Sequence, residues 1–288
     1  LTQLGMVRLL EGNAPAAKTA YEQAYEEMIY GLNSLYFGHV ALLEGNEAEA
    51  LNQYKGVYSE AQLGQILFEI DRMAGKMPDR KARLDAFAMR VRDTIIRNHP
   101  EMLVPEIVDY WVAEQQTAYA FANERWESAA AWNEKSLKAL DVLASGQVDS
   151  YQWKSRKLDA MLSRSYYLIY LGKTKPASLT QAIEFARQGE AYAEKEYAEY
   201  PYLDWFKTNI AHASALRNQP GDRAQAIAIY NQFLDKTSYD YDRWELLQKD
   251  FRDMHRNGMK WPDLKSIILA IKPVDVELSA KEWQEIGI

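Results

Sequence analysis

Apolar residues recur every three or four positions along most of the chain. Residues at this spacing lie on one face of an α-helix, so each such stripe predicts an amphipathic helix. The clearest stripe consists of Leu84, Phe87, Ala88, Val91 and Ile95. No alternation of apolar and polar residues, which is the pattern of a half-buried β-strand, has comparable strength. The pattern therefore predicts an all-α protein.

One five-residue segment occurs twice near the start of the chain. Leu-Leu-Glu-Gly-Asn stands at residues 9–13 and again, 33 residues later, at 42–46. The similarity continues beyond the identical residues, since Ala17 and Tyr21 are matched by Ala50 and Tyr54 at the same offset. Self-similarity at this period indicates helix pairs that stack on one another.

Each copy has an apolar helix, a glycine and a second helix that carries small and aromatic residues at a spacing of four and then three. The first copy supplies Gly5, Gly12, Ala17, Tyr21 and Ala24, and the second supplies Gly38, Gly45, Ala50, Tyr54 and Val57. This arrangement resembles the tetratricopeptide repeat, a helix–turn–helix unit of about 34 residues. The resemblance implies a right-handed α-α superhelix of antiparallel helix pairs.

Weaker copies continue the pattern. They contain Thr117, Glu124 and Ala129; then Ser165, Gly172, Ala182 and Gly189; then Ser214, Gly221, Ala226 and Tyr230. We therefore expect a repeat array over residues 1–238, with copies near 1–28, 32–60, 110–138, 158–192 and 207–236. A diverged helical pair fills 61–105, where Lys76-Met77-Pro78-Asp79 separates two helices and Asp79 is the expected N-cap.

The segment 239–288 is expected to be a C-terminal helical cap that covers the last apolar face of the array. Ser279 and Glu282 have the spacing of a capping box, which predicts a short final helix from about Ala280 to Ile286. At the other end, Leu1 falls inside a helix by repeat register. We therefore expect the natural polypeptide to extend further upstream.

Composition excludes several classes of partner. Lysine and arginine number 34 against 41 acidic residues, a net charge of −7, and no basic cluster suits a phosphate backbone, so nucleic acid is not expected. The longest apolar runs, such as 166–171, are far shorter than the roughly 20 residues that cross a bilayer, so no membrane insertion is expected. The absence of cysteine leaves the compartment open, with the cytoplasm slightly favoured over the periplasm.

Candidate chemistry is sparse. None of the four histidines (His39, His99, His212 and His255) has a potential metal ligand one helical turn away, so neither a metal nor any other cofactor is expected. Gly172-Lys173-Thr174 lacks the glycine five residues earlier that a phosphate-binding loop requires. Pairs of acidic residues are typical of solvated helix faces, and no catalytic residue is predicted.

The resemblance also implies that the first helix of each pair lines a concave surface that receives a peptide. Repeat register places nine residues there: Leu35, His39, Trp111, Glu114, Ala118, Phe121, Leu162, Tyr166 and Tyr170. Some members of the family bind a terminal carboxylate with basic and amide residues at these positions, which this chain lacks. The groove therefore favours an apolar or aromatic segment, although several of these residues could instead pack between helices.

These observations favour a protein- or peptide-binding scaffold without enzymatic activity, belonging to a longer polypeptide of which another domain could be the partner. An alternative is a carbohydrate-active enzyme of the α/α-toroid kind, because 8 tryptophans and 19 tyrosines could line a sugar cleft. Such an enzyme would hold two carboxylates about 5–10 Å apart in an aromatic cleft. A third possibility is a self-assembling protein whose aromatic faces are buried in a symmetric dimer.

Overall fold

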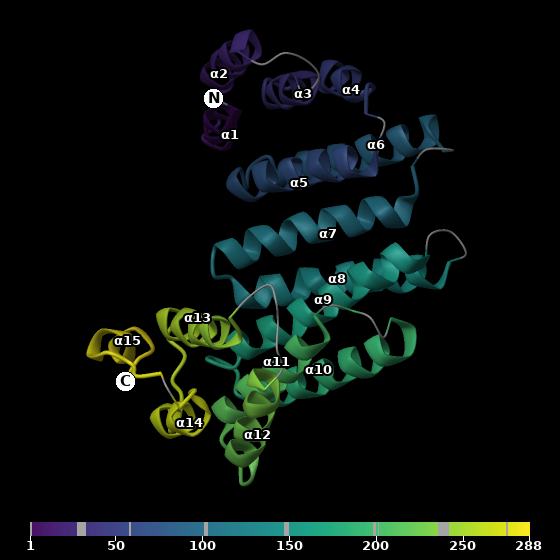
Figure 1. Cartoon of the computed structure of the whole chain (residues 1–288). Coiled ribbons are helices and arrows are strands. Elements are labelled where there is room, and N and C mark those ends of the chain that lie inside the picture. Colours follow the sequence, from purple (N-terminus) through teal and green to yellow (C-terminus); the bar gives the residue numbers. More distant parts are fainter. Residues whose placement is uncertain are drawn as a thin grey trace. The chain divides into compact units, whose positions relative to one another are not determined.

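The computed structural model describes residues 2–27, 33–57, 59–100, 103–146, 150–197, 200, 202–235, 242–274 and 276–288. This part of the chain contains fifteen α-helices and no β-strand (Figure 1), which confirms the all-α prediction. Contacts divide the chain into two compact units, Leu1–Gln116 and Thr117–Ile288.

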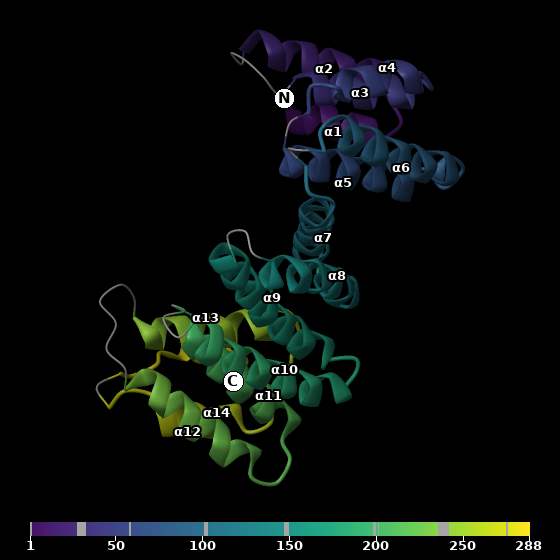
Figure 2. The same ribbon diagram turned by 90° about the vertical axis from the view of Figure 1, so that its right-hand side faces the viewer.

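The first unit is built from consecutive helix pairs (Figure 2). Its helices are α1 (Thr2–Leu10), α2 (Ala14–Glu27), α3 (Asn33–Leu43), α4 (Glu47–Tyr54), α5 (Glu60–Lys76), α6 (Lys81–Asn98) and the N-terminal part of α7 (Pro105–Ala122). Helix α1 packs on α2, α3 on α4 and α5 on α6, while α1 also contacts α3 and α5. Neighbouring pairs therefore share one apolar core, as expected for stacked repeats.

The two copies of the repeated segment have the same backbone geometry. Gly12 and Gly45 adopt φ of 77° and 90°, in the left-handed region that glycine enters without a steric cost. Each glycine ends a helix in a Schellman motif, in which the next residue donates a backbone hydrogen bond to a carbonyl five residues earlier, at 2.9 Å and 2.8 Å. Glu124, at the same position of the third predicted copy, also has a positive φ of 54°.

Small residues in the first helix of each copy face the tyrosine of the second helix. A Cβ atom added at Gly5 would lie 2.3 Å from the ring of Tyr21, and one added at Gly38 would lie 2.3 Å from the ring of Tyr54. Both tyrosines are buried. The repeated glycine–tyrosine spacing therefore reflects close contact between paired helices.

The predicted break between α5 and α6 is confirmed, because α5 ends at Lys76 and α6 begins at Lys81. Asp79 is not the N-cap that we expected. Arg80 occupies that position and its side chain makes no capping hydrogen bond. In the first turns of α6, Lys81 and Asp85 form an exposed ion pair, with 2.8 Å between Nζ and Oδ2.

The second unit is also a series of neighbouring helices. They are the end of α7 followed by α8 (Trp126–Ser145), α9 (Ser150–Leu171), α10 (Ala177–Glu196), α11 (Leu203–Arg217), α12 (Asp222–Leu234), α13 (Arg243–Arg256), α14 (Leu264–Ile271) and α15 (Ala280–Glu285). Each helix from α8 to α12 packs on the next, and α9 also contacts α11. Helices α9 and α11 therefore lie side by side, although α10 separates them in sequence (Figure 1).

The C-terminal segment belongs to the core of the second unit. Tyr230 and Phe233 of α12 share a cluster of buried residues with Phe251 of α13, Ile267 of α14 and Ile286, which follows α15. Contacts divide the chain after Gln116, within the third predicted copy. The predicted boundary at 238–239 and the predicted copy ends at 28 and 236 lie outside the described residues.

The final helix follows the prediction closely. Helix α15 begins at Ala280, and Ser279 and Glu282 form both hydrogen bonds of a capping box. The Ser279 amide donates to Glu282 Oε2 at 2.7 Å, and the Glu282 amide donates to Ser279 Oγ at 3.3 Å. Across the described residues, no helix combines the length and the apolar character that a membrane span requires.

Candidate functional site

A cavity of about 350 Å³ opens in the second unit. Its walls come from α7, α9, α11 and α13, which are the alternate helices of the series. The lining residues are Phe121, Leu162, Ser163, Tyr166, Tyr167, Trp205, Asn209 and Asp250. Leu162 and Tyr166 on α9, like Trp205 and Asn209 on α11, are four residues apart, so each pair presents its side chains from one face of its helix.

Aromatic rings form most of the wall. Phe121 is 38% exposed and its ring lies 5.4 Å from those of Tyr167 and Trp126. Behind the lining, the ring of Tyr170 stacks on Trp126 with a centroid distance of 4.3 Å. The hydroxyl oxygens of Tyr170 and Tyr166 lie 2.9 Å apart and share a hydrogen bond. These contacts hold the aromatic side chains in fixed orientations.

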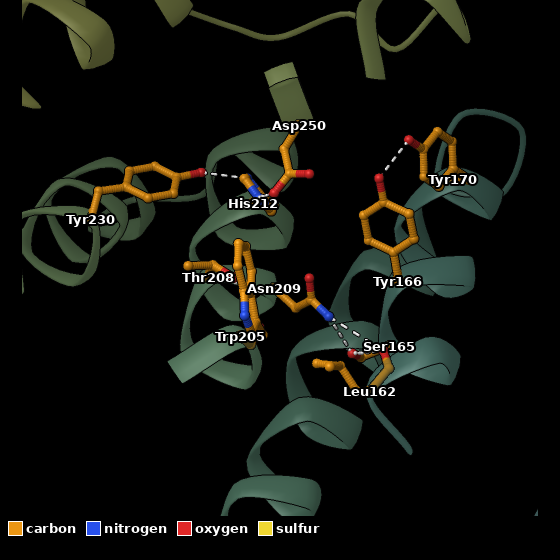
Figure 3. A network of polar contacts seen from close by, with 10 residues as sticks. All are labelled: Leu162, Ser165, Tyr166, Tyr170, Trp205, Thr208, Asn209, His212, Tyr230 and Asp250. Atoms are coloured by element: carbon orange, nitrogen blue, oxygen red, sulfur yellow. Dashed lines mark hydrogen bonds and ion pairs between the residues drawn. The ribbon is translucent and has the colours of Figure 1, made fainter. Parts of the chain in front are cut away.

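Asn209 presents a carbonyl oxygen to the cavity. Its side chain is almost fully buried, and Nδ2 donates to Ser165 Oγ at 2.7 Å and to the Leu162 carbonyl at 3.3 Å. The Ser165 hydroxyl donates its one hydrogen bond to the Leu162 carbonyl, so in its contact with Asn209 it must be the acceptor. This network fixes the amide orientation, and Oδ1 points toward the space beside Tyr166 (Figure 3).

Asp250 is held by a buried histidine. His212 Nε2 lies 3.3 Å from Asp250 Oδ2, and His212 Nδ1 lies 2.7 Å from the Tyr230 hydroxyl. Because a carboxylate can only accept, Nε2 carries a proton and donates to Asp250. Burial raises the pKa of Tyr230 well above its usual range, which keeps that hydroxyl protonated.

The other carboxylate oxygen of Asp250 points away from His212 toward the Tyr166 side of the site (Figure 3). Its negative charge affects the nearby phenols. Burial, with a smaller contribution from Asp250, raises the pKa of Tyr170 to about 12 and that of Tyr166 further still. Both hydroxyls are therefore neutral at physiological pH, and Asp250 carries the only charge among the residues described as lining the cavity.

Three of the nine predicted contact residues, Phe121, Leu162 and Tyr166, line this cavity. Tyr170 supports them from behind and is 2% exposed. Of the remaining five, Ala118 is exposed near the C-terminal end of α7. Trp111 and Glu114 belong to the first unit. Trp111 packs closely against α5 there, because a Cβ atom added at Gly64 would lie 2.7 Å from Trp111 Cβ.

Leu35 and His39 were expected on an accessible surface, and the structure corrects this. Both are buried in the core of the first unit, and His39 is fully enclosed. Its ring is bonded to the Tyr54 hydroxyl and to Glu69, so neither nitrogen is available to a partner. The repeat register identified the helix face but could not separate inter-helix packing from exposure.

The sequence missed Asn209, Trp205 and Asp250. The histidine test considered ligands one helical turn away, whereas His212 is bonded to residues 18 and 38 positions later. One signal was present: both histidines lie in a first helix, and both contact the tyrosine at the same repeat position, Tyr54 or Tyr230. A search for polar residues opposite that tyrosine would have found each pair.

The described part of the chain contains no group of three or more His, Asp or Glu side chains placed to hold a metal ion. The cavity offers aromatic rings, hydroxyl groups, one amide oxygen and one carboxylate, which are groups suited to binding. Comparisons with known proteins add no assignment to this geometry. No protein-family model, no curated protein and no solved structure matches the chain.

Proposed function

We propose that the chain is a peptide-binding helical-repeat scaffold of the tetratricopeptide kind, and that the cavity of the second unit is its binding site. The observation that carries this proposal is the origin of the lining residues, since α7, α9, α11 and α13 contribute all of them. Alternate helices are the ones that line the concave face in the right-handed superhelix that the resemblance implies.

The size and chemistry of the cavity support a peptide ligand. Its volume of about 350 Å³ is at the lower end for ligand pockets and suits one or two side chains of an extended segment. Rigid aromatic residues are the usual hot spots of protein interfaces because they bury large areas with little loss of side-chain entropy. Phe121, Tyr166, Tyr167 and Trp205 provide such a surface.

The carbohydrate-active alternative receives less support from this cavity. Hydrolysis of a glycosidic bond ordinarily uses two carboxyl groups that flank the bond. Among the described residues that line the cavity, only Asp250 carries a carboxyl group, and one of its oxygens is bonded to His212. This arrangement supports recognition of a ligand more than general acid–base chemistry on one.

The proposal can be tested by panning a displayed library of random dodecapeptides against the full chain. Affinities of the selected peptides are then measured by calorimetry for the wild type and for the double variant Phe121→Ala, Tyr166→Ala. Loss of two aromatic anchors is expected to weaken binding by at least about tenfold. Circular dichroism establishes that the variant remains folded.

Tyr151→Ala provides the matched control, because Tyr151 is an exposed aromatic residue of α9 that does not line the cavity. Its removal is expected to leave affinity unchanged. Peptide binding should also slow amide hydrogen exchange in α9 and α11. Selected peptides that bind the double variant as tightly as the wild type would contradict the assignment of the site.

A further inference from the structure

We infer that the cavity of the second unit binds the ammonium group of a lysine side chain, presented by an apolar or aromatic peptide segment. This inference rests on the proposed peptide-binding function and specifies the residue that the peptide must carry. It follows from three observations: a carboxylate with one oxygen unpaired, an oriented amide oxygen and a surrounding wall of aromatic rings.

The carboxylate of Asp250 has unused capacity. Its Oδ2 accepts from His212, and the described residues supply no hydrogen bond to Oδ1 and no lysine or arginine within ion-pair distance. The side chain is only 21% exposed. A partly buried carboxylate with one unpaired oxygen attracts a cation that can enter the cavity.

Asn209 adds a second acceptor to the cavity. The amide protons of Asn209 are already bonded to Ser165 and Leu162, which leaves its oxygen as an acceptor. That oxygen and Asp250 Oδ1 point toward the same space (Figure 3). An ammonium group has three N–H donors and no acceptor, so acceptor oxygens are the partners that it requires.

The aromatic wall stabilises a cation further. A cation near the face of an aromatic ring is attracted by the ring's quadrupole, most strongly by tryptophan and tyrosine when water is excluded. The cavity contains Trp205, Tyr166 and Tyr167 together with Phe121. An anionic side chain would instead be repelled by the charge of Asp250.

The geometry favours lysine over arginine. A guanidinium group binds carboxylates best through two parallel hydrogen bonds, one to each oxygen. In Asp250 one oxygen already accepts from His212, so this paired arrangement is obstructed. The compact ammonium group needs only the second oxygen, and the methylene groups of lysine can lie along the rings.

The test uses the full chain and the peptides selected by panning. We expect the selected peptides to share a lysine, and replacement of that lysine by norleucine, which keeps the methylene chain and removes the charge, to weaken binding by at least about tenfold. Replacement by arginine should weaken binding by a smaller factor. Asp250→Asn in the protein should reproduce the norleucine effect, because asparagine can still accept from His212 but carries no charge.

Asp253→Asn is the matched control. Asp253 lies one turn further along α13, pairs with Arg256 at 3.2 Å and does not line the cavity. It changes net charge by the same amount as Asp250→Asn, so a general attraction of basic peptides to the acidic chain would affect both variants equally. We expect a change of less than about twofold for Asp253→Asn.

The outcomes separate the two proposals. Peptides that bind through the aromatic wall but share no lysine, or that bind Asp250→Asn as tightly as the wild type, would overturn the lysine assignment and leave the peptide-binding function standing. Selection of no peptide that depends on Phe121 and Tyr166 would remove the proposed function, and the lysine assignment with it. The norleucine measurement needs no protein variant, so it remains decisive even if Asp250→Asn is unstable.

Discussion

Each unit contains a tyrosine–histidine–carboxylate chain of hydrogen bonds, and the two differ in what surrounds the carboxylate. In the first unit His39 Nδ1 lies 2.6 Å from the Tyr54 hydroxyl and His39 Nε2 lies 2.6 Å from Glu69 Oε2. In the second unit His212 makes the same two bonds, to Tyr230 and to Asp250. Both histidines are fully buried.

The carboxylate of the first unit is enclosed and fully bonded. Glu69 is 6% exposed, and its second oxygen accepts from Gln65 Nε2 at 2.6 Å. Tyr21 and Tyr36 stack on each other with their ring centroids 4.7 Å apart. Burial, followed by the charge of Glu69, raises the pKa of both tyrosines. Nothing remains for an external ligand, so this chain of bonds has a structural role.

The carboxylate of the second unit lines a cavity instead. Burial, followed by smaller contributions that include the charge of Asp250, raises the pKa values of Tyr166 and Tyr170. The shorter aspartate leaves one oxygen without a partner among the described residues. The same arrangement, a histidine packed against the tyrosine of a helix pair, therefore occurs in an enclosed core in the first unit and beside an open cavity in the second.

The two tyrosine–histidine–carboxylate hydrogen-bond chains should differ most in how much stability the protein loses when the histidine is replaced. His39→Leu leaves Glu69 and the Tyr54 hydroxyl buried without their main partner, and should lower the free energy of unfolding by about 3 kcal/mol or more. His212→Leu should cost about 1–2 kcal/mol, because Asp250 can be hydrated from the cavity. Urea unfolding, with hydrogen exchange to locate each unit, measures both; equal losses would contradict the distinction.

An intermediate effect is expected where the first helix of a pair packs against Tyr54 or Tyr230. Gly38→Ala places a methyl group against the Tyr54 ring and should cost about 1–3 kcal/mol. Ser214 holds the equivalent repeat position of the second unit and its hydroxyl is buried without a partner among the described residues, so Ser214→Ala should be neutral or slightly stabilising. Urea unfolding measures both variants.

Gly75→Ala serves as the control for Gly38→Ala. Gly75 is exposed in α5 and a Cβ there would meet nothing within 4 Å, so alanine should stabilise the helix by about 0.5–1 kcal/mol. If Gly38→Ala were as favourable as Gly75→Ala, the close approach of α3 and α4 would not limit the residue at position 38.

The smallest effect concerns the tyrosine pair beside the cavity. Tyr170→Phe removes the 2.9 Å hydroxyl bond to Tyr166 and should cost about 0.5–1.5 kcal/mol at neutral pH. The folded-state pKa of Tyr170, about 12, is above the unfolded value of about 10. The stability that this hydroxyl contributes is therefore complete below about pH 10 and is lost as pH rises toward 12.

The difference between the wild type and Tyr170→Phe should accordingly shrink above about pH 10. Unfolding curves for both proteins at a series of alkaline pH values measure this change, and phenolate absorbance reports when the tyrosines ionise. A difference that stays constant up to the onset of alkaline unfolding would show that Tyr170 ionises with its unfolded-state pKa.

Much of the fold could be predicted because its signals are local. The glycine of each Leu-Leu-Glu-Gly-Asn segment ends a helix in the left-handed conformation, and the Ser279–Glu282 capping box starts one. The candidate site was predicted only in part. Phe121, Leu162 and Tyr166 follow from repeat register, whereas Asn209, Trp205 and Asp250 reach the cavity from helices whose register relative to α9 is not encoded locally.

By itself the sequence determined the helices, their turns and the small-residue contacts within pairs, because helix periodicity, capping and glycine conformation depend on neighbours within a few residues. Only the tertiary structure decided which apolar faces are sealed and which remain open. His39 and His212 illustrate the reason. The carboxylate that His39 contacts is 30 positions away in the sequence, and the one that His212 contacts is 38 positions away. Exposure at such a site depends on how several helices pack together, and no single segment specifies that.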